Sequence, residues 1–170
     1  DWSPETVTSS GRFTTDSFDF AAAFGPVQGA AGTIVFTDLL GLVTAPDQQL
    51  RIAAINPGIE VNDGVMTYEM RPDHVLAIKG AHWPFMDGAL RLQPAVKRYS
   101  VAEERRYTLE IDGISAGRFI ERLELANLAA TGIFDGVLPL VFDENGGHIE
   151  GGYMRARPPG GNVSYVGALT

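Results

Sequence analysis

The chain contains no cysteine, which excludes disulfide frameworks, thiol catalysis and cysteine-ligated zinc. No uninterrupted apolar run approaches the ~18 residues of a membrane-spanning helix. No signal peptide opens the sequence either, and residue 1 is Asp rather than Met. We therefore expect the 170 residues to be one piece of a longer protein, whose targeting or anchoring segment lies outside this chain.

Basic residues are also scarce. The chain has 13 Lys and Arg against 21 Asp and Glu, a net charge of −8, and its basic residues are scattered. Two short basic spots, Lys97-Arg98 and Arg105-Arg106, are interpreted as solvated strand ends. Nucleic-acid binding requires clustered cations that neutralise phosphates, so no nucleic-acid partner is predicted.

Signals for catalysis or metal binding are missing. The three histidines, His74, His82 and His148, do not have metal-ligand spacing, and no Gly-x-Ser-x-Gly elbow occurs. The acidic pairs Glu103-Glu104 and Asp143-Glu144 could act as a glycosidase pair only if one carboxyl were buried. Adjacent acids in a turn are normally both exposed. We therefore predict neither an enzyme nor a cofactor.

Glycine and proline, by contrast, are abundant, at 20 and 10 residues, which suits an all-β chain with many turns. Four Asp-Gly pairs recur at intervals of 24, 25 and 23 residues: Asp63-Gly64, Asp87-Gly88, Asp112-Gly113 and Asp135-Gly136. Asp-Gly favours tight turns, and two strands with two turns fill about two dozen residues. The spacing predicts a ladder of β-hairpins with these pairs at the turns, within one domain covering residues 1–170.

Apolar and polar residues alternate in several segments. Val65–Met70 is predicted to pair with Val75–Lys79, the segment Trp83-Pro84-Phe85 to form a turn, and Tyr107–Ile111 to form a further strand.

One segment has helical periodicity instead. Residues 115–125 carry apolar residues at 116, 119, 120 and 123, with Ser115 at the N-cap position. The pattern predicts one short helix that packs Phe119, Ile120 and Leu123 against the apolar face of the sheet.

The apolar residues of successive strands are expected to share one face. Two interpretations stay open, a closed core and a groove left open for an apolar ligand such as an acyl chain. Alternation cannot separate them. The candidate groove residues are Phe36, Met66, Tyr68, Met70, Leu76, Ile78, Leu90, Leu92, Leu109, Ile111, Leu138, Leu140 and Phe142.

Several motifs resemble the C-terminal region of the YdbH-like proteins, over roughly residues 30 to 168. They lie, in order, within Gly32–Leu39, Ile55–Gly64, Trp83–Leu90, Ala130–Leu140, Ile149–Gly152 and Tyr165–Gly167. These proteins belong to the AsmA-like group, which also includes TamB.

The resemblance implies a fold, a location and a role. It implies an elongated, curved antiparallel sheet folded like a taco around an apolar groove, in a Gram-negative periplasmic protein anchored in the inner membrane. It also implies that phospholipid moves along the groove between inner and outer membrane. The alternative is a structural or assembly module of the envelope with a closed core. The terminal strand near Val163–Leu169 is a possible edge for pairing with an envelope protein.

Overall fold

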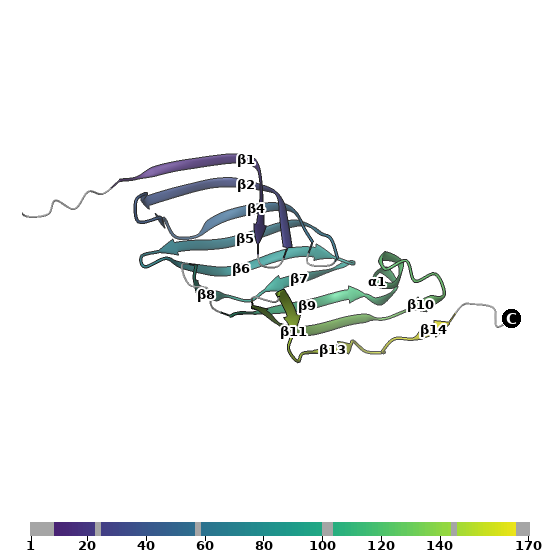
Figure 1. The fold of residues 1–170 in the computed structure, drawn as a ribbon. Coiled ribbons are helices and arrows are strands. Elements are labelled where there is room, and N and C mark those ends of the chain that lie inside the picture. The colour runs from purple at the N-terminus through teal and green to yellow at the C-terminus, as the bar shows by residue number, and fades with distance from the viewer. Residues whose placement is uncertain (1–8, 23–24, 57–58, 100–103, 144–145, 166–170) are drawn as a thin grey trace, which may run out of the picture.

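In the computed structural model, residues 9–22, 25–56, 59–99, 104–143 and 146–165 are described. They form one large antiparallel sheet of twelve strands, a separate two-stranded ribbon and one short helix (Figure 1). No helix within these residues is long and apolar enough to cross a membrane. The predicted class, mainly β with a curved antiparallel sheet and one short helix, is confirmed.

The strands follow one another across the sheet almost in chain order. The order is β1 (Gly11–Ala22), β2 (Gly25–Asp38), β4 (Gln48–Ile55), β5 (Val61–Arg71), β6 (Val75–Phe85), β7 (Gly88–Leu92), β9 (Arg105–Ser115), β11 (Ile133–Asp143) and β12 (Gly146–Ile149). Three short strands join alongside: β3 (Val43–Thr44) on β2, β8 (Ala95–Arg98) on β6 and β13 (Tyr153–Ala156) on β11. The predicted pairing of 65–70 with 75–79 is confirmed.

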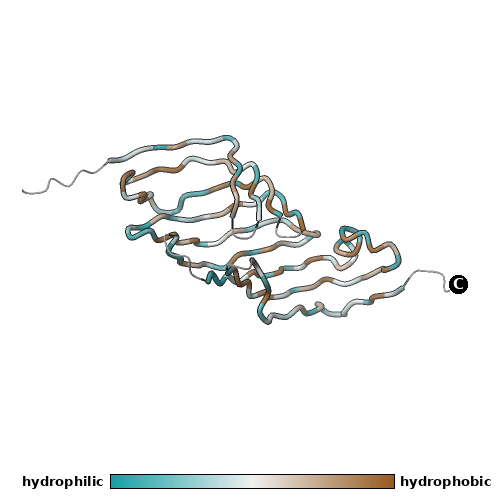
Figure 2. The backbone as a smooth tube through the Cα atoms, viewed as in Figure 1, coloured by the Kyte–Doolittle hydropathy of each residue, from teal (hydrophilic) through white to brown (hydrophobic). Residues whose placement is uncertain are grey.

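The sheet has one apolar and one polar face, because side chains alternate along each strand. Leu90 lies opposite Trp83 on one side and Ile111 on the other, whereas the next residue, Arg91, lies opposite His82 and Glu110. Hydropathy along the backbone tube alternates accordingly (Figure 2). We call the side that carries Trp83, Leu90 and Ile111 the apolar face, and the opposite side the polar face.

The first two strands bend, which curves the sheet. In Figure 1 the last part of β1 and the first part of β2 turn sharply away from the rest of each strand. The β1–β2 register shifts twice, between Thr15 and Phe18 and between Phe18 and Phe20, and Gly29 has a φ of 60°. Bulges of this kind bend strands. The apolar face carries one buried cluster: Val27, Ile52, Ile55, Val61, Ala81, Trp83, Leu90, Ile111 and Ile114.

The prediction that the four Asp-Gly pairs lie at hairpin turns is wrong for three of them. Only Asp87-Gly88 lies at a hairpin turn, between β6 and β7, where Met86 and Asp87 both have positive φ. Asp63-Gly64, Asp112-Gly113 and Asp135-Gly136 lie inside β5, β9 and β11. Asp63 and Gly113 also have positive φ, and the β9–β11 register shifts beside Gly113, so these positions accommodate backbone irregularities within strands.

The predicted turn at Trp83-Pro84-Phe85 is wrong as well, because all three residues end strand β6. There they lie opposite Gly88, Ala89 and Leu90 of β7.

The helix α1 (Ala116–Arg122) is shorter than the predicted 115–125. Ser115 is its N-cap, as predicted, and its Oγ accepts a hydrogen bond from the Arg118 N–H. The predicted packing is wrong, because α1 contacts β9 and β10 (Leu128–Ala130) at the margin of the sheet and Leu123 is exposed. The helix therefore does not cover the centre of the apolar face.

The last described strand does not belong to the large sheet. Strand β14 (Val163–Tyr165) pairs with β10, and residues 166–170 lie outside the described residues. Pairing of this terminal strand with another protein stays a prediction.

Candidate functional site

The thirteen residues predicted to line a groove all lie on the apolar face. The strand register shows this directly, because residues paired across neighbouring strands point to the same side. Met66 pairs with Ala81, Leu109 with Leu92 and Leu138, and Phe142 with Arg105. Whether the face binds lipid is a separate question, which the register does not test.

Burial varies along this face. Tyr68, Ile78, Leu90 and Ile111 are buried, and burial raises the pKa of the Tyr68 hydroxyl, so that this side chain stays neutral. The other nine are half-buried: Phe36, Met66, Met70, Leu76, Leu92, Leu109, Leu138, Leu140 and Phe142. The half-buried side chains keep apolar surface accessible from the open side of the sheet.

One row of side chains crosses the sheet at right angles to the strands. Pairing from strand to strand links Leu50, Met66, Ala81, Leu92, Leu109 and Leu138, on β4, β5, β6, β7, β9 and β11. Ala81 is buried and the other five are half-buried, packed against the buried cluster. We call these six residues the central row. It forms a continuous apolar path across six adjacent strands.

Several apolar residues of this face are not among the thirteen, including Leu50, Ile52, Trp83 and Phe134. Leu50 and Ile52 alternate within β4, so the alternation signal was present in the sequence. Trp83 was assigned to a turn because Pro84 follows it. Phe134 packs against the buried cluster from β11, beside the irregularity at Gly113 that disturbs the local alternation.

The polar face is held by ion pairs. Arg157 contacts Asp112 on β9 and Asp135 on β11 at 2.8 and 2.6 Å, and Arg91 contacts Asp112 at 2.7 Å. These hydrogen bonds lower the pKa of Asp112, and those from Arg157 and the Gly113 N–H lower the pKa of Asp135. The charges stabilise strand neighbours and keep this side hydrated.

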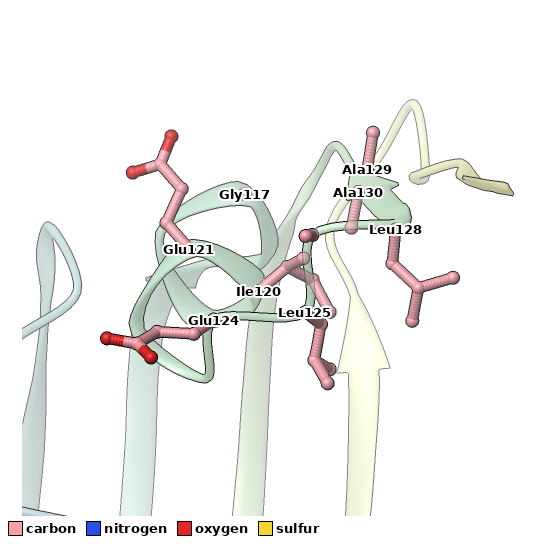
Figure 3. Close-up of a pocket in the computed structure, with 9 residues that line it drawn as sticks. Gly117, Ile120, Glu121, Glu124, Leu125, Leu128, Ala129 and Ala130 are labelled. Carbon is pink, nitrogen blue, oxygen red and sulfur yellow. The ribbon is translucent and has the colours of Figure 1, made fainter. Parts of the chain in front are cut away.

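A pocket of about 430 Å³ lies between α1 and β10, away from the central row. Ile120, Leu125 and Leu128 line it together with small residues. The carboxylates of Glu121 and Glu124 point away from Leu128 (Figure 3). None of the thirteen predicted residues lines this pocket, so it is distinct from the apolar face.

Within the described ranges, no group of three or more acidic or histidine side chains could hold a metal ion. The two acidic pairs considered for catalysis cannot be assessed as pairs, because Glu103 and Glu144 lie outside the described residues. Of their partners, Glu104 is ion-paired with Arg106 at 2.5 Å.

A comparison with models of known protein families identifies the family of this chain. The family model for YdbH-like proteins, described as the intermembrane phospholipid transport protein YdbH, matches residues 1–170. The chain belongs to the YdbH-like family. No curated protein and no solved structure gave a significant match. The family description indicates lipid transport rather than catalysis, and intermembrane transport indicates the cell envelope.

Proposed function

We propose that the apolar face binds the acyl chains of phospholipids as they pass between inner and outer membrane, and that the chain is a non-enzymatic segment of this conduit. Two observations support the proposal: the family is one of intermembrane phospholipid transport, and the sheet presents a continuous apolar row across six strands. The acyl chains would lie along the central row.

The dimensions of the central row suit an acyl chain. Six strands about 4.8 Å apart make the row roughly 24 Å long. One leaflet contributes half of the ~30 Å hydrocarbon core of a bilayer, so a tail is roughly 15 Å deep in the membrane. A single tail therefore fits lengthwise, and the row could continue into neighbouring segments of a longer protein.

The free energies are adequate for a carrier. Removing an acyl chain from water is worth about 0.8 kcal/mol per methylene, on the order of 10 kcal/mol for a chain of ~16 carbons. A uniform apolar row gives no single position a large advantage, which favours sliding. Met66 and Met70 add flexible side chains that adapt to a moving ligand.

The observation that carries the proposal is the partial exposure of the central row. Leu50, Met66, Leu92, Leu109 and Leu138 are only half-buried, and α1 packs at the margin instead of covering them. We further propose a periplasmic location, with a tether to the inner membrane supplied by a segment outside this chain, and strand pairing with an envelope protein near Val163.

A second candidate function is a structural module of the envelope that acts through protein contacts. The buried cluster around Trp83 favours it, since nine apolar residues there are already covered by the protein itself. In that case the half-buried leucines would be the rim of a core rather than a binding surface.

Photo-crosslinking distinguishes the two. A benzophenone side chain placed at position 109 faces the central row, whereas one at position 110 lies on the polar face opposite Arg91 and Val137. During expression in a Gram-negative host, the proposal expects phospholipid adducts from position 109 and few from position 110. Native mass spectrometry should also detect co-purified phospholipid. Equal labelling at both positions, or no adduct at either, would contradict the proposal.

A further inference from the structure

Just over half of the 13 basic residues are paired with carboxylates. Seven basic residues form ion pairs with carboxylates: Arg71, Lys79, Arg91, Arg106, Arg118, Arg122 and Arg157. With 21 acidic residues in the chain, carboxylate partners are plentiful. The other six basic residues form no ion pair with a carboxylate among the described residues: Arg12, Arg51, Lys97, Arg98, Arg105 and Arg155.

Two cations differ by lying on the apolar face. Lys97 of β8 pairs across the sheet with Leu76, and Arg105 of β9 pairs with Phe142. Leu76 and Phe142 both belong to the predicted lipid-facing set. Among the described residues, neither Lys97 nor Arg105 forms an ion pair with a carboxylate, and both are half-buried.

Both cations lie at the same margin of the sheet. Strand β8 pairs with the first four residues of β6, and Arg105 is the first residue of β9, near the end of β11. Tyr107 lies between them: Lys97 Nζ is 5.7 Å from the centre of its ring, and Arg105 is two residues earlier on the same face of β9. Tyr107 in turn contacts Phe142 edge to face, with ring centres 6.0 Å apart.

This arrangement matches the two parts of a phospholipid. Lys and Arg can lay their aliphatic stems along apolar surface while the charged ends reach water. A phosphodiester at this margin would meet two cations that form no ion pair among the described residues, and the attached tails would extend over Leu138, Leu140 and Leu109. Phosphate oxygens are strong acceptors for both side chains.

We propose that Lys97 and Arg105 form a binding site for the phosphodiester of a phospholipid whose acyl chains lie on the apolar face. The inference rests on the proposed function and adds a headgroup site to it. It predicts that anionic phospholipids bind more tightly than lipids of the same tails without phosphate.

The test compares two probes with one fluorescent acyl chain each, phosphatidylglycerol and diacylglycerol, on the whole chain. The double variant Lys97→Gln with Arg105→Gln should weaken phosphatidylglycerol binding about thirtyfold, since each basic residue near an anionic lipid surface is worth roughly a factor of five. Diacylglycerol binding should not change. The control Arg12→Gln with Arg51→Gln removes equal charge from the polar face, where these residues pair with Val35 and Val65, and should change neither affinity.

The outcomes separate this inference from the proposed function. If the unmodified chain binds neither probe, the proposed function fails. If it binds both and the double variant keeps its full affinity for phosphatidylglycerol, only the headgroup site fails. If the double variant loses binding of inorganic phosphate but keeps its affinity for phosphatidylglycerol, the site is one for free anions and the assignment to phospholipid is wrong.

A second measurement needs no variant and covers the case in which the double variant does not fold. Raising salt from 0.1 to 1 M shortens the screening length from about 10 Å to about 3 Å. Phosphatidylglycerol binding by the unmodified chain should weaken while diacylglycerol binding does not. Equal salt responses of the two probes would overturn the headgroup site.

Discussion

The indole ring of Trp83 lies against Gly64 on the neighbouring strand, so closely that a Cβ at position 64 would be 2.1 Å from the ring nitrogen Nε1. Both residues are on the apolar face, and Trp83 is only 6% exposed. A residue without a side chain at this point lets the largest ring of the cluster pack onto β5. Gly136 also lies close to a neighbouring strand, because an added Cβ there would be 2.7 Å from the backbone carbonyl oxygen of Tyr153 on β13.

Replacing Gly64 with alanine should therefore destabilise the sheet. The new methyl group must displace the Trp83 ring, and overpacking of a filled core typically costs about 1–3 kcal/mol. Urea unfolding followed by tryptophan fluorescence would measure this, and the emission of Trp83 should shift as the ring moves. The matched control is Gly11→Ala, where the nearest atom to the added Cβ is Leu39 Cδ2 at 3.6 Å, an ordinary contact. Equal unfolding midpoints for the two variants would show that the ring has room to move.

These close contacts explain which parts of the fold the sequence could predict. Alternation identifies a strand from its own residues, so the pairing of 65–70 with 75–79 was predicted correctly. The Asp-Gly spacing reveals a repeat of two strands, but the requirement for glycine at positions 64 and 136 comes from neighbouring strands, from the Trp83 ring and from the Tyr153 carbonyl oxygen. Local turn preference cannot distinguish such a position from the true turn at Asp87-Gly88.

In the candidate site too, some features follow from the local sequence and others from the packing of neighbouring strands. A period of two places all thirteen predicted residues on one face, because that step needs only local geometry. Two features depend on the pairing of distant strands instead: the burial of Ile111 in a cluster that also contains Val27 of β2, and the position of Arg105 opposite Phe142. In the sequence Arg105-Arg106 is one basic spot. In the sheet its two members point to opposite faces.

The ion pairs of the polar face predict how stability depends on pH. The pKa values of Asp112 and Asp135 are lowered in the folded state by Arg91, Arg157 and the Gly113 N–H. Their stabilisation is therefore complete above the ordinary aspartate value of 3.8 and is lost as the pH falls through the lower folded values. The melting temperature should drop in acid below about pH 4.

In the double variant Asp112→Asn with Asp135→Asn, this acid-induced drop should be smaller, although the melting temperature at pH 7 is lower. Asp73→Asn, at the exposed turn between β5 and β6, is the control and should retain the steep acid response. Identical pH profiles for the double variant and the unmodified chain would contradict a role for these two carboxylates.

Arg157 should hold the outer edge of the sheet in place. It follows β13 and contacts Asp135 on the neighbouring strand β11 and Asp112 on the next strand, β9. The variant Arg157→Gln is expected to increase amide hydrogen exchange in Tyr153–Ala156 while the global unfolding midpoint changes little, because exposed ion pairs add little to overall stability. Arg155→Gln, on β13 itself and without an ion pair among the described residues, is the comparison. If amide hydrogen exchange in Arg157→Gln is unchanged, backbone hydrogen bonds alone hold β13 in place.

A cation placed on the central row should abolish lipid binding while the sheet stays folded. Met66 is half-buried in the central row, so in Met66→Arg the arginine stem can cover apolar surface while its charge opposes an acyl chain. A cation on a lipid-facing strand costs about 2–4 kcal/mol, which corresponds to at least a tenfold loss of phospholipid affinity. Thr67→Arg, one residue further along β5 and on the polar face, should retain lipid binding. Circular dichroism of both variants measures whether they fold, and lipid titration measures whether they bind phospholipid. If Met66→Arg unfolds and Thr67→Arg does not, the central row is part of a closed core, and the structural-module alternative is the better description.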